Sequence, residues 1–213
     1  GFGVFVLPMS EEFGWDRGTI SLAAAIGALV SGLSQPFLGR LYDRLGGRQL
    51  ILASLVVSGV CTMLLALTTN ILFLILLFGG VLSIAMGGSS LTTTSALLAK
   101  WFHRHRATAM SLNAAGASVG GLLLVPLTVY LIHLMGWRMA WVVLGLLLLL
   151  LVVPLAWALL KDDPAELGLL PDGDPHPVQG SQIAPVRAGP LEVEHWQQSF
   201  RSTPMWQLCG GYF

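Results

Sequence analysis

The stretch GRLYDRLGGR, residues 39–48, lies between two long apolar runs. The runs at residues 20–38 and 50–67 carry no charged side chain, and each is long enough to cross a bilayer as a helix. The stretch between them is therefore expected to be a tight hairpin, with Gly39 and the pair Gly46 and Gly47 supplying positive φ angles at the turn. Its three arginines mark the side of the membrane that stays in the cytoplasm.

The composition of the whole chain supports a membrane protein. Hydrophobic residues make up 54% of the 213 residues and charged residues only 10%, whereas a soluble domain carries about 25% charged residues. The net charge is zero, so no nucleic-acid partner is expected. Cys61 and Cys209 show no metal-ligand spacing and are expected to be small buried residues. The sequence predicts neither a metal site nor a cofactor.

The pattern of apolar runs predicts helices at residues 20–38, 50–67, 71–98, 107–134 and 139–160, preceded at residues 1–9 by the outer half of a first helix. Residues 10–17 are expected to be a loop, with Asp16 capping the next helix. Residues 161–203 are expected to be a linker, because the first part of this segment is rich in Pro, Gly and Asp. Residues 204–213 are expected to begin a seventh helix.

Basic residues are distributed unevenly among the loops. The loops assigned to the cytoplasm hold seven lysines and arginines, whereas the outer loops hold only Arg17 and Arg138. This asymmetry predicts a cytoplasmic N-terminus and a cytoplasmic linker. The seven cytoplasmic residues are Arg40, Arg44, Arg48, Lys100, Arg104, Arg106 and Lys161.

Two apolar segments carry further expectations about packing. Small residues recur at four-residue spacing in the second helix, at Ala23, Gly27 and Ser31, with Ala28 and Gly32 on an adjacent line. Such spacing lets a neighbouring backbone approach closely. The run at residues 146–151 has no polar residue and is expected to face lipid.

The spacing of Gly39, Asp43, Arg44, Gly46 and Arg48 resembles the pattern G-x-x-x-D-[RK]-x-G-[RK]-[RK], which joins the second and third helices in the major facilitator superfamily. One basic position of that pattern is glycine here, at residue 47. Four shorter motifs are similar to its bacterial branch of monocarboxylate porters and oxalate/formate antiporters. They are EEFGW at 11–15, WF at 101–102, GWR at 136–138 and PAELGLLP at 164–171.

The resemblance implies an all-α membrane protein in which residues 1–160 form a six-helix transmembrane bundle, the N-terminal half of a twelve-helix fold. The chain is accordingly interpreted as a fragment of a longer transporter, cut inside one helix at each end. Its partners would be the missing C-terminal six-helix bundle, the lipid bilayer and a small-molecule substrate held between the bundles. The expected location is the bacterial inner membrane.

The same resemblance implies a secondary active transporter for small organic solutes, such as monocarboxylates or other organic anions, coupled to protons or to a counter-substrate. A drug or metabolite exporter of the same fold is the alternative. An enzyme or receptor would need a cluster of catalytic or ionisable groups inside the membrane, and the sequence shows none. A channel is disfavoured because no loop resembles a selectivity filter.

Polar residues inside the spans are the candidates for lining a substrate cavity. Thr93 and Asn113 each lie seven residues from a basic turn, which places both about 10 Å inside the cytoplasmic face and in reach of one another. The alternative is that the hydroxyls bond to their own helix or join helices together. The candidates are Gln35, Ser90, Thr93, Thr94, Asn113 and Ser118.

Charged residues are expected only at the membrane surfaces, since no Asp, Glu, Lys or Arg lies in the middle of these spans. By the resemblance, Asp43 would help to hold the two bundles together on the cytoplasmic side, with Arg104 and Arg106 as local partners. Glu11 and Glu12 are expected to be solvated loop charges, and His133 to lie at the outer interface.

Overall fold

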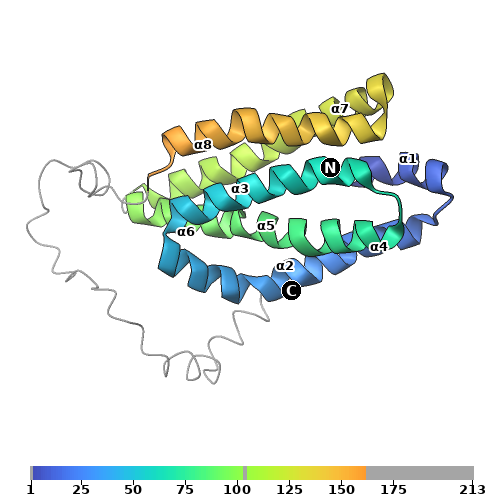
Figure 1. Cartoon of the computed structure of the whole chain (residues 1–213). Helices are drawn as coiled ribbons and strands as arrows, with labels where there is room; N and C mark the ends of the chain where they lie inside the picture. The colour runs from blue at the N-terminus through green and yellow to red at the C-terminus, as the bar shows by residue number, and fades with distance from the viewer. Residues whose placement is uncertain (1, 103–104, 162–213) are drawn as a thin grey trace, which may run out of the picture. The chain divides into compact units, whose positions relative to one another are not determined.

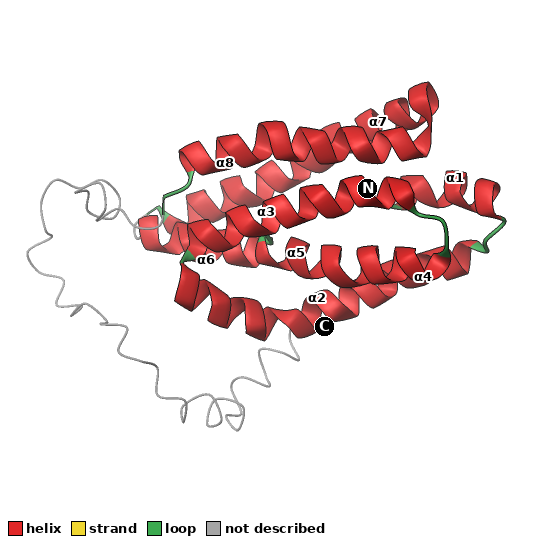
Figure 2. Cartoon of the chain, in the orientation of Figure 1, coloured by secondary structure: helices red, strands yellow, loops and turns green. Residues whose placement is uncertain are grey.

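The structure is a computed structural model that describes residues 2–102 and 105–161, and within these ranges it is helical with no strand (Figures 1 and 2). Arg104, the expected linker from residue 162 and the expected seventh helix lie outside the described residues. The elements are α1 (Gly3–Phe13), α2 (Arg17–Leu45), α3 (Gly47–Leu64), η1 (Leu65–Leu67), α4 (Ile71–Leu74), η2 (Ile75–Leu82), α5 (Ser83–Gly88), α6 (Leu91–Trp101), α7 (Arg106–Leu147), η3 (Leu148–Val152) and α8 (Val153–Leu159).

Among the described residues, four helical stretches are long and apolar enough to cross a membrane: Arg17–Leu45, Gly47–Leu67, Ile71–Trp101 and Arg106–Leu159. The last of them reverses at Gly136, where a φ of 80° and a ψ of 161° interrupt the helix, so it supplies two passages. Figure 1 shows the chain running along α7 to this reversal and returning to α8. The five helices predicted after the first are therefore confirmed.

Contacts far apart in the sequence show which helix ends meet. Arg48 donates from Nη2 to the carbonyl oxygen of Trp157 at 2.9 Å, and Trp101 donates from Nε1 to the carbonyl oxygen of Lys161 at 3.1 Å. We call this end of the bundle, which holds the turn at Gly46 and the end of α8, the basic end. α1 and the reversal of α7 lie at the opposite end (Figure 1).

Helix boundaries differ from the expected ones at both sides of α2. Asp16 caps α2 as predicted, accepting a hydrogen bond from the Gly18 amide at 2.9 Å. The predicted loop at residues 10–17 is wrong, because α1 continues to Phe13 and ends at Gly14, whose φ is 66°. The hairpin at residues 39–48 is also much shorter than predicted. α2 continues to Leu45, and only Gly46, with a φ of 86°, makes the turn.

Gly39 and Gly47 therefore do not have the positive φ angles that the sequence analysis expected, because both are helical. Gly47 is needed for a different reason. A Cβ atom there would stand 2.7 Å from the Tyr42 ring and 3.0 Å from the Leu97 side chain. The departure of residue 47 from the family pattern is thus explained by close packing at the turn.

Small residues bring α2 against η2 and α5, as the four-residue spacing predicted. A Cβ atom on Gly27 would stand 2.5 Å from the Ser83 hydroxyl oxygen, and one on Gly79 would stand 3.0 Å from the Ala23 carbonyl oxygen. Further along, a Cβ atom on Gly87 would stand 3.4 Å from the Ser31 hydroxyl oxygen. These helices touch through backbone, which is how helices associate in lipid.

The apolar run at residues 146–151 is only partly turned outward. Leu146, Leu150 and Leu151 are exposed, as expected for a helix facing lipid. Leu148 and Leu149 instead pack against Gly59 of α3, where an added Cβ atom would stand 2.6 Å from Leu149 Cγ. The polarity of the run could not distinguish its two sides, because every residue in it is leucine.

Candidate functional site

The fourth span is interrupted near its middle. α5 ends at Gly88 and α6 begins at Leu91, with Ser90 in an extended conformation between them. The Thr93 hydroxyl lies 3.4 Å from both the Ser90 hydroxyl and the Gly87 carbonyl oxygen, which also accepts from the Ser90 amide at 3.3 Å. Irregular backbone at membrane depth is tolerated only where protein buries it or where it lines a cavity. The sequence analysis missed this break, although the run from Gly87 to Ser90 carries its signal.

The break is held by tight packing against neighbouring helices. A Cβ atom on Gly88 would stand 2.1 Å from the Ser54 hydroxyl oxygen, and one on Gly87 would stand 2.9 Å from Leu38 Cδ1. Both glycines are buried. A larger side chain at either position would require the Ser54 or Leu38 side chain to shift.

Asn113 joins α7 to α6 just beyond this break. Its amide Nδ2 donates to the Thr94 hydroxyl at 3.0 Å and lies 3.5 Å from the Ser95 hydroxyl. Thr94 in turn donates to the Ser90 carbonyl oxygen at 3.1 Å. The contact was expected at Thr93, but Asn113 bonds to the adjacent Thr94, and the Thr93 hydroxyl lies against Ser90 and Gly87. The Thr94 hydroxyl also bonds to carbonyl oxygens of its own segment, which is the alternative to cavity lining that the sequence analysis kept open.

Gln35 and Thr93 line a second feature, a cavity of about 460 Å³ between α2 and α6. Asp43 and Tyr42 lie at its end toward the turn, so the cavity joins a candidate substrate residue to the charged motif. The sequence analysis did not identify Tyr42 or Thr92 as part of this site. Its lining residues are Gln35, Pro36, Leu38, Gly39, Tyr42, Asp43, Thr92, Thr93 and Ala96.

Ser118 stands apart from the other candidates. It is exposed on α7 and donates to the Ala114 carbonyl oxygen of its own helix at 3.2 Å. Within the described residues it contacts neither the break in the fourth span nor Gln35, so its role in a cavity stays a prediction.

Asp43 is exposed near the end of α2. In the part of the chain that the structure describes, one salt bridge is present and it does not involve Asp43 or Arg106. Arg104 lies outside the described residues, so the expected pairing with it stays a prediction. Next to Asp43 on α2, Tyr42 has the ammonium of Lys100 from α6 at 5.4 Å from the centre of its ring.

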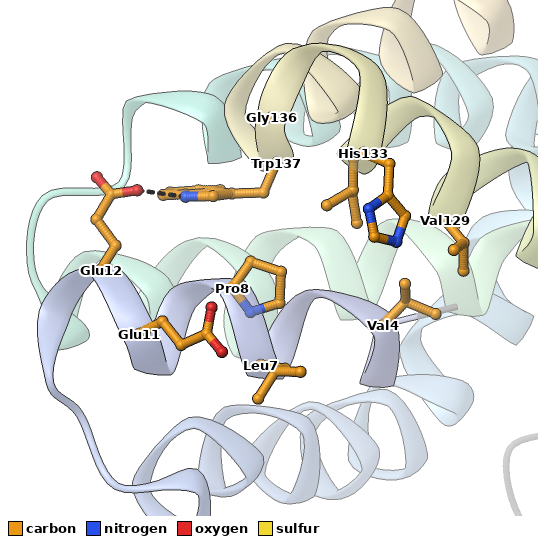
Figure 3. A pocket seen from close by; sticks show the side chains of 10 residues that line it. Val4, Leu7, Pro8, Glu11, Glu12, Val129, His133, Gly136 and Trp137 are labelled. Atoms are coloured by element: carbon orange, nitrogen blue, oxygen red, sulfur yellow. Dashed lines mark hydrogen bonds between the residues drawn. The ribbon is translucent and has the colours of Figure 1, made fainter.

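At the opposite end, Glu12 is not the solvated loop charge that was expected. It lies in the last turn of α1, and its Oε1 accepts from Arg138 Nη2 at 2.9 Å while Oε2 accepts from the Trp137 indole (Figure 3). The Arg138 hydrogen bond, and then that of Trp137, lower the pKa of Glu12 below its usual value. Arg138 also donates to the Ala66 carbonyl oxygen at 2.9 Å. These bonds tie three helix ends together.

Beside this ion pair lies a cavity of about 790 Å³ between α1 and the first half of α7. Glu11 and His133 line it from the two helices, with Pro8 and Leu7 along its floor (Figure 3). His133 is exposed there, at the end of the bundle where the sequence analysis expected it.

Comparison with known proteins finds membrane transporters. The family model described as Major Facilitator Superfamily matches residues 1–213. An uncharacterized MFS-type transporter, YcxA, of Bacillus subtilis is 26% identical over 163 residues, which are 76% of this chain and 40% of that protein. Human monocarboxylate transporter 14 is 27% identical over 77% of this chain and 33% of its own length.

A third relative is described as the probable sulfoacetate transporter SauU of Cupriavidus necator. It is 28% identical over 159 residues, covering 72% of this chain and 35% of that protein. The chain thus spans between a third and two fifths of the length of these relatives.

Proposed function

Because this chain belongs to the major facilitator superfamily, which makes it part of a multi-pass membrane transporter, we propose that it forms the N-terminal half of a secondary active carrier. The intact carrier moves small organic anions by alternating access, with a second six-helix bundle completing the substrate site. The basic end of the bundle faces the bacterial cytoplasm, in keeping with the excess of lysine and arginine there.

The observation that carries this proposal is the interrupted fourth span with its bond from Asn113 to Thr94. An amide inside an apolar bundle is costly unless its hydrogen bonds are satisfied, and the Asn113 amide reaches two hydroxyls of the next helix. A discontinuous helix near mid-membrane, flanked by polar side chains, is a common way to build a transporter's binding site. A polar site without fixed charge supplies hydrogen bonds to a carboxylate but leaves the balancing cation to the other bundle.

The proposed class of substrate is supported by the names of two relatives. One relative is described as a monocarboxylate transporter and another as a probable sulfoacetate transporter. Both names refer to small organic anions, which favours anion transport over the alternative of drug or metabolite export. Coupling to protons or to a counter-substrate is part of the same proposal.

The test is uptake of labelled lactate, pyruvate and sulfoacetate by the intact carrier in proteoliposomes, with and without an inward proton gradient. Asn113→Leu removes the amide and is expected to lower uptake about tenfold, the effect of losing about 1.4 kcal/mol of binding. Ser111→Ala is the matched control, because Ser111 lies on the same helix and bonds only to its own Ala107 carbonyl oxygen in the described part of the chain. Absence of uptake for all three anions, together with active efflux of an apolar dye, would favour the exporter.

A further inference from the structure

An apolar groove runs along the outside of the bundle between α3 and α8. Its volume is about 680 Å³. Val56 and Val57 on one wall are each 41% exposed, and Trp157 on the other is 64% exposed. None of the lining side chains is charged, and the only polar atom among them is the Trp157 indole nitrogen. The lining residues are Leu52, Ala53, Val56, Val57, Val153, Pro154 and Trp157.

The groove ends beside a cation at the basic end. Arg48 precedes Leu52 by four residues and so stands on the same side of α3, one turn nearer the membrane surface. Its guanidinium lies 5.8 Å from the centre of the Trp157 ring and donates to the Trp157 carbonyl oxygen. Lys161 follows two residues after the end of α8. Arg48 therefore lies beside the groove, and Lys161 lies at the same end of the bundle.

The direction of the groove matches that of a lipid chain. From Arg48 to Val57 the helix rises about 13 Å, so the groove follows α3 from the surface toward the middle of the membrane. Tryptophan at the end of such a groove is typical of the level of the lipid headgroups. A free anion would use the cation and leave the apolar groove empty, whereas a neutral lipid would use the groove and gain little from the cation.

We propose that this groove binds one acyl chain of an anionic phospholipid, whose phosphate is held by Arg48 and Lys161. A guanidinium has five N–H donors in a planar fork, a geometry suited to binding phosphate and a carbonyl oxygen together. The proposal depends on membrane insertion only and is independent of the substrate that the carrier moves.

The test is native mass spectrometry of the purified intact carrier, delipidated and then titrated with dioleoyl phosphatidylglycerol or dioleoyl phosphatidylcholine. Phosphatidylglycerol is expected to bind with the higher affinity. Arg48→Gln is expected to weaken its binding about fivefold, which corresponds to about 1 kcal/mol for one basic residue at the membrane surface. The affinity for phosphatidylcholine should change less.

Variants that fill the groove test the contribution of the acyl chain separately from that of the headgroup. Val57→Trp is expected to lower phosphatidylglycerol binding, whereas Val60→Trp, on the same helix and 44% exposed but outside the groove, should leave it unchanged. If Val57→Trp does not fold, Ala53→Phe fills the same space. The proposal would be overturned if the two lipids bound equally or if the groove-filled variant bound phosphatidylglycerol as well as the unaltered carrier does. It would also be overturned if millimolar inorganic phosphate alone displaced phosphatidylglycerol.

Discussion

Two outer faces of this bundle both expose apolar side chains but differ in the kinds of residue that are exposed on them. The face between α3 and α8 carries branched and aromatic side chains such as Val56, Val57 and Trp157. α2 and α7 expose large apolar side chains such as Leu33 and Leu112 too, but they also expose glycines. A Cβ atom added at Gly32, Gly39, Gly116 or Gly120 would meet nothing within 4 Å. We call the first the apolar face and the second the glycine faces.

The difference indicates what covers each face. Branched apolar side chains are well matched to lipid tails, and glycine adds nothing there. Exposed glycine in a membrane helix instead leaves room for a second backbone at close range. The relatives are more than twice the length of the matched region. By the proposed function, the second bundle would lie against the glycine faces. Exposure alone would not have separated the two faces.

The strongest test of the apolar face is a charge placed in its middle. Val56→Lys should nearly abolish membrane-inserted protein, because lysine at the centre of a span costs about 2.5–3.5 kcal/mol on insertion scales. Quantitative immunoblotting of membrane fractions measures this. Ala117→Lys, on the exposed glycine side of α7, should be inserted better. Equal insertion of both variants would contradict the distinction between the faces.

The second largest effect is expected when a glycine inside the bundle is replaced. Gly145→Val is expected to destabilise the carrier by about 1–3 kcal/mol, because a Cβ atom would stand 2.4 Å from Met63 Cγ and 2.8 Å from the Gly59 carbonyl oxygen. Thermal unfolding followed by size-exclusion chromatography measures the loss.

Gly116→Val is the matched variant on the passage of α7 before the reversal at Gly136, with open space around its Cβ position. It should lower uptake more than it lowers thermal stability, if a second bundle meets this face. Normal uptake in Gly116→Val would remove the main support for a helix lying there.

Asp43 stands at the basic end of α2, beyond the exposed glycines, whereas Arg48 stands at the basic end of the apolar face. Asp43→Asn should lower uptake several-fold and raise labelling of cavity cysteines from the side that holds Arg44. A surface charge contributes about 0–1 kcal/mol, which is enough to shift a balanced two-state equilibrium. Asp43→Glu is the control, since it keeps the charge. Unchanged uptake and unchanged labelling in Asp43→Asn would refute the role of Asp43.

The smallest effect concerns Glu12, which belongs to neither face. The lowered pKa of Glu12 means that its bond to Arg138 stabilises the fold fully above the ordinary carboxyl pKa of 4.5, and that the contribution is lost as the pH falls through the lower folded value. Both side chains are about 40% exposed, so the contribution is below about 1 kcal/mol.

Glu12→Gln should therefore lower the melting temperature slightly at pH 7 and by less at pH 3. Measurement of melting temperature across this range tests the prediction, with Glu11→Gln as the control on the same helix. A larger effect of Glu12→Gln at pH 3 than at pH 7 would contradict it.

Much of the fold was predictable because its signals are local. An uncharged run of about twenty residues predicts a span wherever it occurs, and Asp16 caps α2 through the amide two residues away. The similar depth of Thr93 and Asn113 was predictable too, since both are counted from basic turns at the same end, but the bond from Asn113 goes to Thr94. Small residues at four-residue spacing predicted the approach of η2 to Gly27 without showing which helix would come.

What the sequence by itself determined, then, is the number and place of the spans and the basic character of one end, since these follow from hydropathy and charge along the chain. Only the tertiary structure decided that the fourth span breaks at Ser90, that Glu12 binds Arg138 from 126 residues away, and that Trp157 and Val57 enclose a groove beside Arg48. These features depend on how each helix is rotated against its neighbours. Rotation is set by packing among many side chains at once, and no single stretch of sequence carries it.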